Sequence, residues 1–261
     1  MSRVSVLGVI PARLGSERLP RKPLHPLAGR PLIEWVWRAA RAVAALDALV
    51  IATDSEEVAR VCRAFGADVE LTAATHESGT DRVAEVVRRP RFRGFDVVVN
   101  IQGDEPFLTD EQVSAAVRMV VDGWEVGTVA TPIRSLDAYR DPSVVKVVRA
   151  EDGGALYFSR APIPHRRGGE PTATELESPL YLRHVGIYAY TRDALERWVS
   201  LPPSTLERTE RLEQLRALEA GIRIGVGVVS HAEGGVDTPA DAQRAEERLR
   251  RTQAATNPEI T

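Results

Sequence analysis

The chain has 261 residues, which is long enough to bury a sizeable core in one domain, and its single cysteine, Cys62, excludes an internal disulfide. Its 34 basic and 37 acidic residues nearly balance, and the resulting net charge of -3 argues against a general nucleic-acid footprint. There is no apolar run long enough for a transmembrane helix, and no apolar signal segment before the first strand pattern. The sequence therefore predicts a globular cytoplasmic protein with no membrane insertion and no nucleic-acid partner.

In the first half of the chain, apolar runs rich in β-branched residues alternate with amphipathic segments. The apolar runs predict strands at Val4–Ile10, Ala48–Thr53, Asp68–Leu71, Asp96–Ile101 and Gly127–Pro132. The amphipathic segments predict helices at Pro31–Ala45, Glu56–Phe65, Thr80–Val87 and Thr109–Val121. Ser55 is a typical N-cap for the second helix, and Gly66 is a typical residue to end it. This alternation predicts an α/β fold, a mostly parallel sheet flanked by helices on both faces.

The pattern changes after Pro142. Two strand-like segments, Val144–Ala150 and Ala155–Ser159, flank the turn sequence EDGG and predict a β-hairpin. After a polar loop, the expected elements are strand Leu182–Tyr190, helix Glu207–Ala220, strand Arg223–Val229 and helix Pro239–Arg250. We expect one domain over residues 1–251, with a hairpin-containing sub-domain inserted at roughly 142–190 and a flexible tail at 252–261.

The first candidate site is the loop after the first strand, in the segment VSVLGVIPARLGSERLPRKPL from Val4 to Leu24. This loop carries four cationic side chains with a glycine and a serine: Arg13, Arg18, Arg21, Lys22, Gly15 and Ser16. Ligands of open α/β sheets bind at the carboxyl ends of the strands, where fixed positive charge and free backbone N–H groups suit a polyphosphate. A solvated basic loop has the same composition, and neither a Walker A nor a GxGxxG pattern is present.

Two carboxylates are candidates for a metal site. Asp104 lies in NIQGDEP, just past the strand DVVVNI, where Gly103 permits a tight turn. Asp237 lies in VDTPAD, before the last helix, where a helix cap made by Thr238 and Asp241 explains the neighbours but does not need Asp237. Two carboxylates on different loops at one sheet edge suit Mg²⁺ held against a phosphate. An acidic helix-capping turn is the alternative for each segment.

The segment HESGTDR precedes a predicted helix. Its Ser78, Gly79 and Thr80 offer hydroxyls and free backbone donors at a helix start, a natural site for an anion or a polar base, and Arg82 follows one turn inside. A Ser/Thr capping box is the commoner outcome for such a turn.

Four further polar residues carry no functional signal by themselves. In RHVGIYAY, His184 and Tyr188 share one strand face and are typical of a core histidine and a core aromatic residue. In LEQLRAL, Glu213 and Gln214 are typical of a solvated helix surface.

Seven motifs occur in one order along nearly the whole chain: IPARLGSERLPRKPL, HESGTDR, NIQGDEP, YFSRAPIP, RHVGIYAY, LEQLRAL and GVDTPAD. In order and spacing they resemble the 3-deoxy-manno-octulosonate (KDO) cytidylyltransferases, the CMP-KDO synthetases. The resemblance implies a nucleotidyltransferase-type, Rossmann-like fold with a dimerisation sub-domain, and a homodimer. It also implies an Mg²⁺-dependent enzyme that transfers CMP from CTP to the anomeric hydroxyl of KDO, giving CMP-KDO and pyrophosphate for lipopolysaccharide biosynthesis.

The resemblance also implies a role for individual residues. The catalytic set would be Arg13, Lys22, Asp104 and Asp237, with the two aspartates holding Mg²⁺. The expected CTP-binding residues are Pro11, Ala12, Arg13, Lys22, Ser78, Gly79 and Asp104. The expected KDO-binding residues are Arg82, Gln102, Arg160, His184, Tyr188, Glu213 and Gln214, with either arginine meeting the KDO carboxylate. The chain departs from the family pattern at His165, where an aromatic residue is commoner, and at Asp81, where Glu is also common.

Three alternatives remain open at this point. A cytidylyltransferase for another acidic sugar is the nearest; the sialate enzymes usually read R-G-G-S-K-G-I in the first loop, so SERLPRKPL favours KDO, but amino-KDO is not separated from KDO. A pyrophosphorylase using UTP or dTTP normally has a glycine-rich first loop, and PARLGS is poor in glycine. A non-catalytic nucleotide-binding protein of the same fold is disfavoured by the presence of Asp104 and Asp237 beside Arg13 and Lys22.

Overall fold

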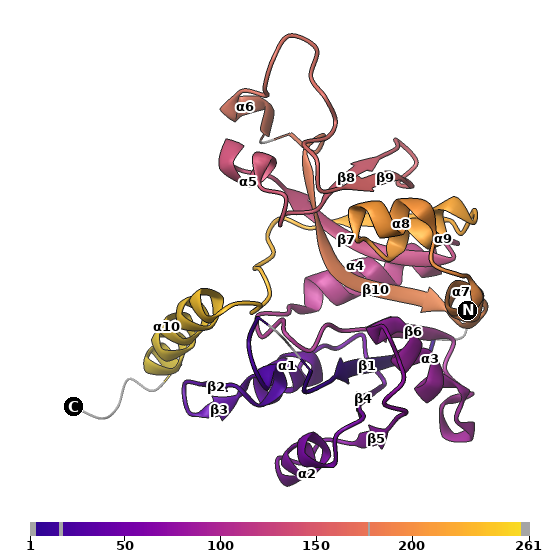
Figure 1. Cartoon of the computed structure of the whole chain (residues 1–261), viewed down its shortest axis with the longest axis vertical. Helices are drawn as coiled ribbons and strands as arrows, with labels where there is room; N and C mark the ends of the chain where they lie inside the picture. The colour runs from indigo at the N-terminus through magenta and orange to yellow at the C-terminus, as the bar shows by residue number, and fades with distance from the viewer. Residues whose placement is uncertain (1–3, 16–17, 177, 257–261) are drawn as a thin grey trace.

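A computed structural model describes residues 4–15, 18–176 and 178–256 of the chain. Within these residues, nine strands form one mixed sheet in the order β11-β7-β10-β6-β1-β4-β5, with β8 paired to β10 and β9 paired to β8 (Figure 1). These strands are β1 (Val6–Ala12), β4 (Ala48–Thr53), β5 (Val69–Leu71), β6 (Val97–Asn100), β7 (Val126–Pro132), β8 (Lys146–Arg149), β9 (Ala155–Ser159), β10 (Leu182–Thr191) and β11 (Ile224–Val228). A separate small ribbon pairs β2 (Pro26–Leu27) with β3 (Arg30–Pro31).

The sheet is mostly parallel, as predicted. Strands β4 and β6 flank β1 in parallel, β5 is parallel to β4, and β11 is parallel to β7. There are two exceptions. Strand β10 runs antiparallel to both β6 and β7, and the β8–β9 hairpin pairs with β10 through β8, also antiparallel. The parallel strands bring the carboxyl ends of β1, β4 and β6 to one edge, where a ligand site of an open α/β sheet is expected.

Helices cover both faces of this sheet. The helical segments are η1 (Lys22–Leu24), α1 (Leu32–Arg41), α2 (Glu56–Ala64), α3 (Gly79–Arg88), η2 (Pro90–Phe92), α4 (Asp110–Val121), α5 (Leu136–Arg140), α6 (Ala173–Leu176), α7 (Arg192–Ser200), α8 (Thr205–Glu210), α9 (Gln214–Glu219) and α10 (Pro239–Thr256). Alternate residues of β1 enter different cores: Val6 and Ile10 pack in a cluster with residues of α1, α2, α4 and α10, whereas Leu7 and Val9 pack in a cluster with residues of α3, α7 and α9. Burying each such side chain stabilises the fold by about 1.5–3 kcal/mol.

Local signals fix several helix ends. Ser55 caps α2 by accepting the Val58 N–H, as predicted, and Gly66 after it has a φ of +89°, which glycine adopts without strain. Thr109 caps α4 in a capping box with Gln112.

The predicted helix Glu207–Ala220 is wrong, because the structure has two helices there. Arg211 ends α8 with a φ of +53°, in the left-handed region, and α9 starts only at Gln214. The Glu210 carboxylate accepts hydrogen bonds from Ser159 Oγ at 2.6 Å and from the Arg160 N–H at 2.9 Å. These contacts hold the last residue of α8 against the hairpin, and the chain turns at the next residue instead of continuing as a helix. The apolar pattern of each half fits a helix, so it does not reveal the break.

The proposed insertion at 142–190 does not separate cleanly from the sheet. Its hairpin is present, with Lys146 opposite Ser159, but β10 is a central strand between β6 and β7. At the other end of the chain, α10 continues to Thr256, so the expected tail begins in a helix; residues 257–261 lie outside the described residues. None of the helices in the described part of the chain has the length and apolarity that crossing a bilayer requires.

Candidate active site

A cleft of about 1010 Å³ opens at the carboxyl ends of β1 and β6. Because these strands are parallel neighbours, the segments that follow them start side by side. Most of the predicted site residues line this cleft: Pro11, Ala12, Arg13, Lys22, Ser78, Gly79, Arg82, Gln102, Asp104, Arg160 and Asp237. The structure therefore brings most of the predicted residues together in one cleft, whereas the role of each residue stays a prediction.

Two glycines let three segments crowd together at the end of β1. A Cβ on Gly103 would lie 2.7 Å from the Pro11 carbonyl oxygen, closer than any side chain tolerates. A Cβ on Gly79 would lie 3.2 Å from Pro11 Cγ. The turn after β6 and the start of α3 consequently both pack against the last residues of β1.

Lys22 lies between the two carboxylates that the sequence proposed for a metal. Its ammonium contacts Asp104 and donates a 2.8 Å hydrogen bond to Asp237 Oδ1. Burial acts to lower the pKa of Lys22, but the charges and hydrogen bonds of Asp104 and Asp237 outweigh it and raise the pKa above its ordinary value. The predicted helix cap after Asp237 is also present, since Thr238 Oγ1 accepts the Asp241 N–H at 3.2 Å. That cap leaves the Asp237 side chain available to the cleft.

A third carboxyl, Glu105, lies beside this pair. Burial raises the pKa of Glu105 to about 8, the charge of Asp104 adds to the rise, and Arg183 on β10 opposes it. The raised pKa disfavours the charged form of Glu105, and the carboxylates that pair with Lys22 are those of Asp104 and Asp237.

The start of α3 forms another part of the cleft wall. Ser78 caps this helix in a capping box with Asp81, and its hydroxyl also lies 3.2 Å from Glu213 Oε1. Burial raises the pKa of Glu213, which lies at the start of α9, although its hydrogen bonds with Thr80 and Ser78 act in the opposite direction. Ser78 therefore caps α3 and also lines the cleft, so its role as a helix cap does not prevent it from contacting a ligand.

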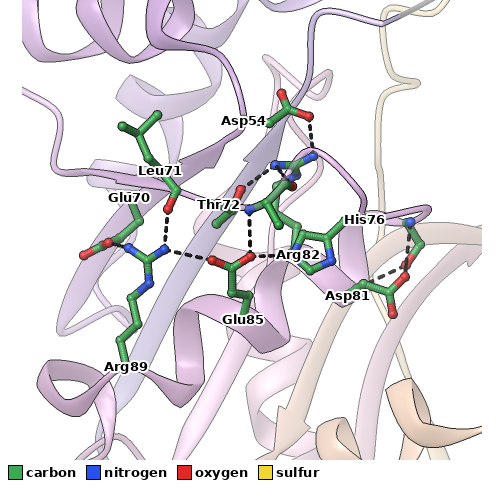
Figure 2. A network of polar contacts seen from close by, with 11 residues as sticks. Asp54, Glu70, Leu71, Thr72, His76, Asp81, Arg82, Glu85 and Arg89 are labelled. Carbon is green, nitrogen blue, oxygen red and sulfur yellow. Dashed lines mark hydrogen bonds and ion pairs between the residues drawn. The ribbon is translucent and has the colours of Figure 1, made fainter.

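Arg82 is held by protein groups, as Figure 2 shows. Its guanidinium donates a 2.8 Å hydrogen bond to Asp54 Oδ2, contacts Thr72 Oγ1 and reaches the Ala73 carbonyl at 3.4 Å. The side chain is only 3% exposed. Because Arg82 is buried and its charge is already paired with Asp54, it is less suited to meet the sugar carboxylate than Arg160, which is half-buried and whose guanidinium donates to neutral carbonyls.

Arg160 is placed by the hairpin and by the break between α8 and α9. Its Nε donates to the Glu210 carbonyl at 2.8 Å, and its Nη1 donates to the Pro142 carbonyl at 2.9 Å. The Arg160 carbonyl in turn accepts a 2.8 Å hydrogen bond from Lys146, a fully buried lysine whose ammonium also binds the carbonyls of Asp141 and Val144. Three carbonyl partners satisfy the three N–H donors of that ammonium.

The other four predicted sugar-binding residues do not line the cleft described above: His184, Tyr188, Glu213 and Gln214. His184 accepts or donates a 2.9 Å hydrogen bond with Thr128 Oγ1 and packs edge-on against Phe158. Burial lowers the pKa of His184 to about 3, and the charge of Arg183 adds to the effect, so the ring is neutral. Gln214 is buried at the start of α9, so the solvated helix surface expected from LEQLRAL is wrong for it.

Comparison with known proteins decides the family. A cytidylyltransferase family model matches residues 7–224. A relative from Gemmatimonas aurantiaca, named 3-deoxy-manno-octulosonate cytidylyltransferase, is 51% identical, and the match covers 92% of this chain and 92% of the relative. This chain belongs to the KDO cytidylyltransferase family. A KDO cytidylyltransferase from Acinetobacter baumannii is 44% identical over 90% of this chain and 94% of its own length.

Solved structures agree with this family. The CMP:2-keto-3-deoxy-manno-octonic acid synthetase complexed with CTP superposes with a TM-score of 0.86 at 40% identity, over 95% of this chain and 99% of that chain. A putative glucose-1-phosphate thymidylyltransferase from Bacillus anthracis superposes at 0.61 with 18% identity, over 94% of this chain and 96% of that chain, which shows the fold alone. The expected nucleotidyltransferase-type fold is therefore confirmed.

In this KDO cytidylyltransferase, the donor set at the cleft fits a hard cation. Asp104 and Asp237 already share one cation, the Lys22 ammonium, and carboxylate oxygens are ligands that Mg²⁺ prefers. Among the described residues, no group of three or more His, Cys, Asp or Glu side chains is arranged to hold a metal ion. Two protein carboxylates are nevertheless sufficient for Mg²⁺, which usually keeps waters and substrate phosphates as its other ligands.

Two arginines that line the cleft were missing from the predicted site. Arg211 lines the cleft together with Arg160. Nothing in the sequence signalled it, because it lies within the segment predicted as one continuous helix. Arg18 lies 3.1 Å from Asp237 Oδ1, and its signal was its place in the basic loop, where the resemblance named only Arg13 and Lys22. Ser16 of that loop lies outside the described residues.

Proposed function

We propose that this chain transfers CMP from CTP to the anomeric hydroxyl of KDO, releasing pyrophosphate and supplying CMP-KDO for lipopolysaccharide assembly. The observation that carries the proposal is the convergence of the basic loop after β1 with Asp104 and Asp237 in one cleft. The names of the relatives support KDO as the acceptor, and the CTP complex of the similar synthetase supports CTP as the donor.

Arg13 and Lys22 would bind the triphosphate, because both are cationic side chains in the cleft wall. Fixed charges of this kind stabilise developing phosphate charge without reorganisation during the reaction. The main chain of residues 11–13, with Ser78 and Gly79, would bind the cytosine. Arg13 already lies near this edge, since its Nη1 is 3.5 Å from the Glu77 carbonyl.

Asp104 and Asp237 would hold the Mg²⁺ ion that the family implies. When bound, the ion would supply charge neutralisation at the phosphates. Lys22 supplies a second positive charge at the same carboxylates, and its raised pKa keeps it protonated at the pH of the reaction.

The sugar acid would approach from the side of Arg160 and Gln102, which line the cleft, with His184, Tyr188, Glu213 and Gln214 expected around it. The anomeric hydroxyl oxygen attacks the α-phosphorus of CTP and loses its proton to water, the bond from that phosphorus to the bridging oxygen breaks, and pyrophosphate leaves in line. Two anions must meet, so Arg160 would neutralise the sugar carboxylate while Arg13 and Lys22 neutralise the phosphates. The protein forms no covalent bond, and positioning supplies much of the rate.

Pyrophosphate release tests the proposal directly. The wild-type protein is incubated with Mg²⁺ and KDO, and CTP, UTP, dTTP and ATP are compared in parallel. We expect release that requires both CTP and KDO. Release only with sialic acid or amino-KDO would support CMP transfer but show that the acceptor is a different acidic sugar. No release with any pair would contradict the proposed transfer.

We also propose a homodimer, formed through the β8–β9 hairpin. Leu156 on β9 is 61% exposed, and Val228 on the neighbouring β11 is 39% exposed, which is costly for apolar side chains that stay in water. Leu156→Asp should convert a dimer to a monomer by light scattering. Val121→Asp is the matched control, because Val121 is equally exposed but lies on α4. A Leu156→Asp variant that stays dimeric would contradict the hairpin interface.

The proposed place of action is the cytoplasm. Cys62 is a free, buried thiol in α2, which suits a reducing compartment.

A further inference from the structure

The loop between β5 and α3, residues 72–77, is tied down by side chains of α3 (Figure 2). Glu85 Oε2 accepts two hydrogen bonds from it, from the Ala73 N–H at 2.8 Å and from His76 Nε2 at 2.5 Å. Arg82 binds the other backbone polar group of Ala73, since its Nη1 donates to the Ala73 carbonyl at 3.4 Å. Ala73 is exposed, yet both of its backbone polar groups bind side chains of α3.

Arg89 anchors this arrangement to the sheet. Its Nη2 donates to Glu85 Oε1 at 2.9 Å and contacts the carbonyl of Leu71 at the end of β5, while its Nη1 pairs with Glu70. Arg82 and Glu85 lie three residues apart on one face of α3, and Arg89, the C-cap residue of this helix, follows Glu85 by four. Glu85 is the central group, because its carboxylate joins the loop on one side to the Arg89 anchor on the other.

The Glu85 carboxylate is held in its charged form. Burial acts to raise the pKa of Glu85, but the hydrogen bonds from Ala73 and His76 outweigh burial and lower the pKa. Charge-assisted hydrogen bonds of this kind are stronger than neutral ones, so they can hold a loop whose own residues are largely exposed.

The loop leads directly into the part of the cleft wall that is proposed to bind the nucleotide, which we call the nucleotide edge. His76 is followed by Glu77, Ser78 and Gly79, all three of which line the cleft. The Glu77 carbonyl is also the group that Arg13 approaches. Glu85 does not line the cleft, so any effect on nucleotide binding must act through the loop.

We propose that Glu85 is a positioning residue for the nucleotide: it holds residues 72–77 in the conformation that presents Ser78 and Gly79 to CTP. This inference rests on the proposed function. When the contact is lost, the loop populates other conformations, and the apparent affinity for CTP falls in proportion to the fraction of molecules that remains in the competent one. The residues proposed for the sugar acid lie on other segments, so its binding should change much less.

The experiment compares Glu85→Gln with a matched control, Glu196→Gln. Glu196 on α7 also pairs with an arginine of α3, Arg88, at 2.6 Å, but it does not contact the loop. CTP binding in the presence of Mg²⁺ is measured by titration calorimetry, and the KM of each substrate and the kcat are measured by pyrophosphate release. For Glu85→Gln we expect the Kd and KM for CTP to rise about tenfold, with the KM for KDO and the kcat changed less than about twofold.

A second pair of variants separates positioning from simple loss of stability. His76→Ala removes the side-chain donor to Glu85 and should also raise the Kd for CTP, whereas His76→Gln offers a side-chain N–H again and should restore most of the affinity. Glu196→Gln should bind CTP like the wild type.

The outcomes are distinguishable. If Glu85→Gln binds CTP as tightly as Glu196→Gln, with only the melting temperature lowered, Glu85 is structural and the inference is wrong. An increase in the KM for KDO equal to that for CTP would also overturn it, because the effect would not be confined to the nucleotide edge. A wild-type protein that binds CTP but releases no pyrophosphate would contradict the proposed function while leaving the binding test of Glu85 intact. If the wild type binds no CTP, both fail.

Discussion

Replacing Asp54 by asparagine tests whether Arg82 is held by a buried ion pair. Asp54 lies after β4, its Oδ2 accepts a 2.8 Å hydrogen bond from Arg82 Nη2, and it does not line the cleft. The exchange keeps the shape of the side chain and removes its charge. The Arg82 guanidinium then has only neutral acceptors: the asparagine amide oxygen, Thr72 Oγ1 and the Ala73 carbonyl.

The size of the effect follows from burial. The side chain of Arg82 is 3% exposed and that of Asp54 is 20% exposed, so the charge left behind is almost fully desolvated. Removing one partner of a buried pair costs about 3–5 kcal/mol, and the partial exposure of Asp54 favours the lower end, about 3 kcal/mol. In a chain of this size, 1 kcal/mol corresponds to about 2–4 °C in melting temperature, so we expect a fall of about 6–12 °C.

Asp68→Asn provides the matched control. Asp68 Oδ1 lies 3.1 Å from Arg91 Nη2, but both side chains are about half exposed, and Arg91 keeps a second partner in Glu70. An exposed pair of this kind contributes about 0–1 kcal/mol. Urea and thermal unfolding of the two variants are compared with the wild type. If Asp54→Asn is no less stable than Asp68→Asn, the buried pair does not hold Arg82, and its guanidinium becomes available for the sugar acid after all.

Two further predictions concern the cleft, and a third concerns the buried His184. Asp104→Asn should nearly abolish pyrophosphate release with the fold intact by circular dichroism, and a near wild-type rate would remove Asp104 as a metal ligand. Gly103→Ala should weaken CTP binding strongly, because its Cβ would lie 2.7 Å from a carbonyl oxygen of β1, whereas Gly94→Ala, with open space around it, should bind CTP normally in the same titration. Burial lowers the pKa of His184 to about 3 against about 6.5 in the unfolded chain, so the unfolded state binds more protons between these values and stability falls as the pH drops below about 6.5. His184→Gln should therefore show a weaker loss of stability on acidification, measured by urea unfolding; equal slopes would contradict the lowered pKa.

The sequence predicted the sheet closely, because the signal for a buried strand lies in consecutive residues. The segment Ala48–Thr53 is β4 as predicted, and Ala155–Ser159 is β9. The break at Arg211 was not predictable in this way, since it depends on contacts between Glu210 and the hairpin about fifty residues earlier in the chain. A local apolar pattern records which face of a helix is buried, not which distant segment interrupts it.

The same limit applies to charged side chains. The motif HESGTDR correctly placed Arg82 in the cleft wall. It carried no information on Asp54, which lies on a different element and takes up the charge. Burial of Lys146 was equally invisible, because its three partners are backbone carbonyls, which have no sequence signature.

The meeting of Asp104 with Asp237 shows how a correct expectation can rest on an incomplete reason. We expected the two carboxylates together because both follow strands at one sheet edge, but β11 and β6 are separated in the sheet by β7 and β10. Following a strand at that edge would therefore leave Asp237 some distance from Asp104. What joins them is the segment after β11, which runs back across the sheet edge: the Val236 N–H donates to the Asp104 carbonyl at 2.8 Å, and a Cβ on Gly235 would lie 3.5 Å from the Asp104 carboxylate. A Cβ at that distance would make only an ordinary van der Waals contact, so the segment passes close beside Asp104 without crowding it, and this close return, rather than strand order, brings the acidic pair together.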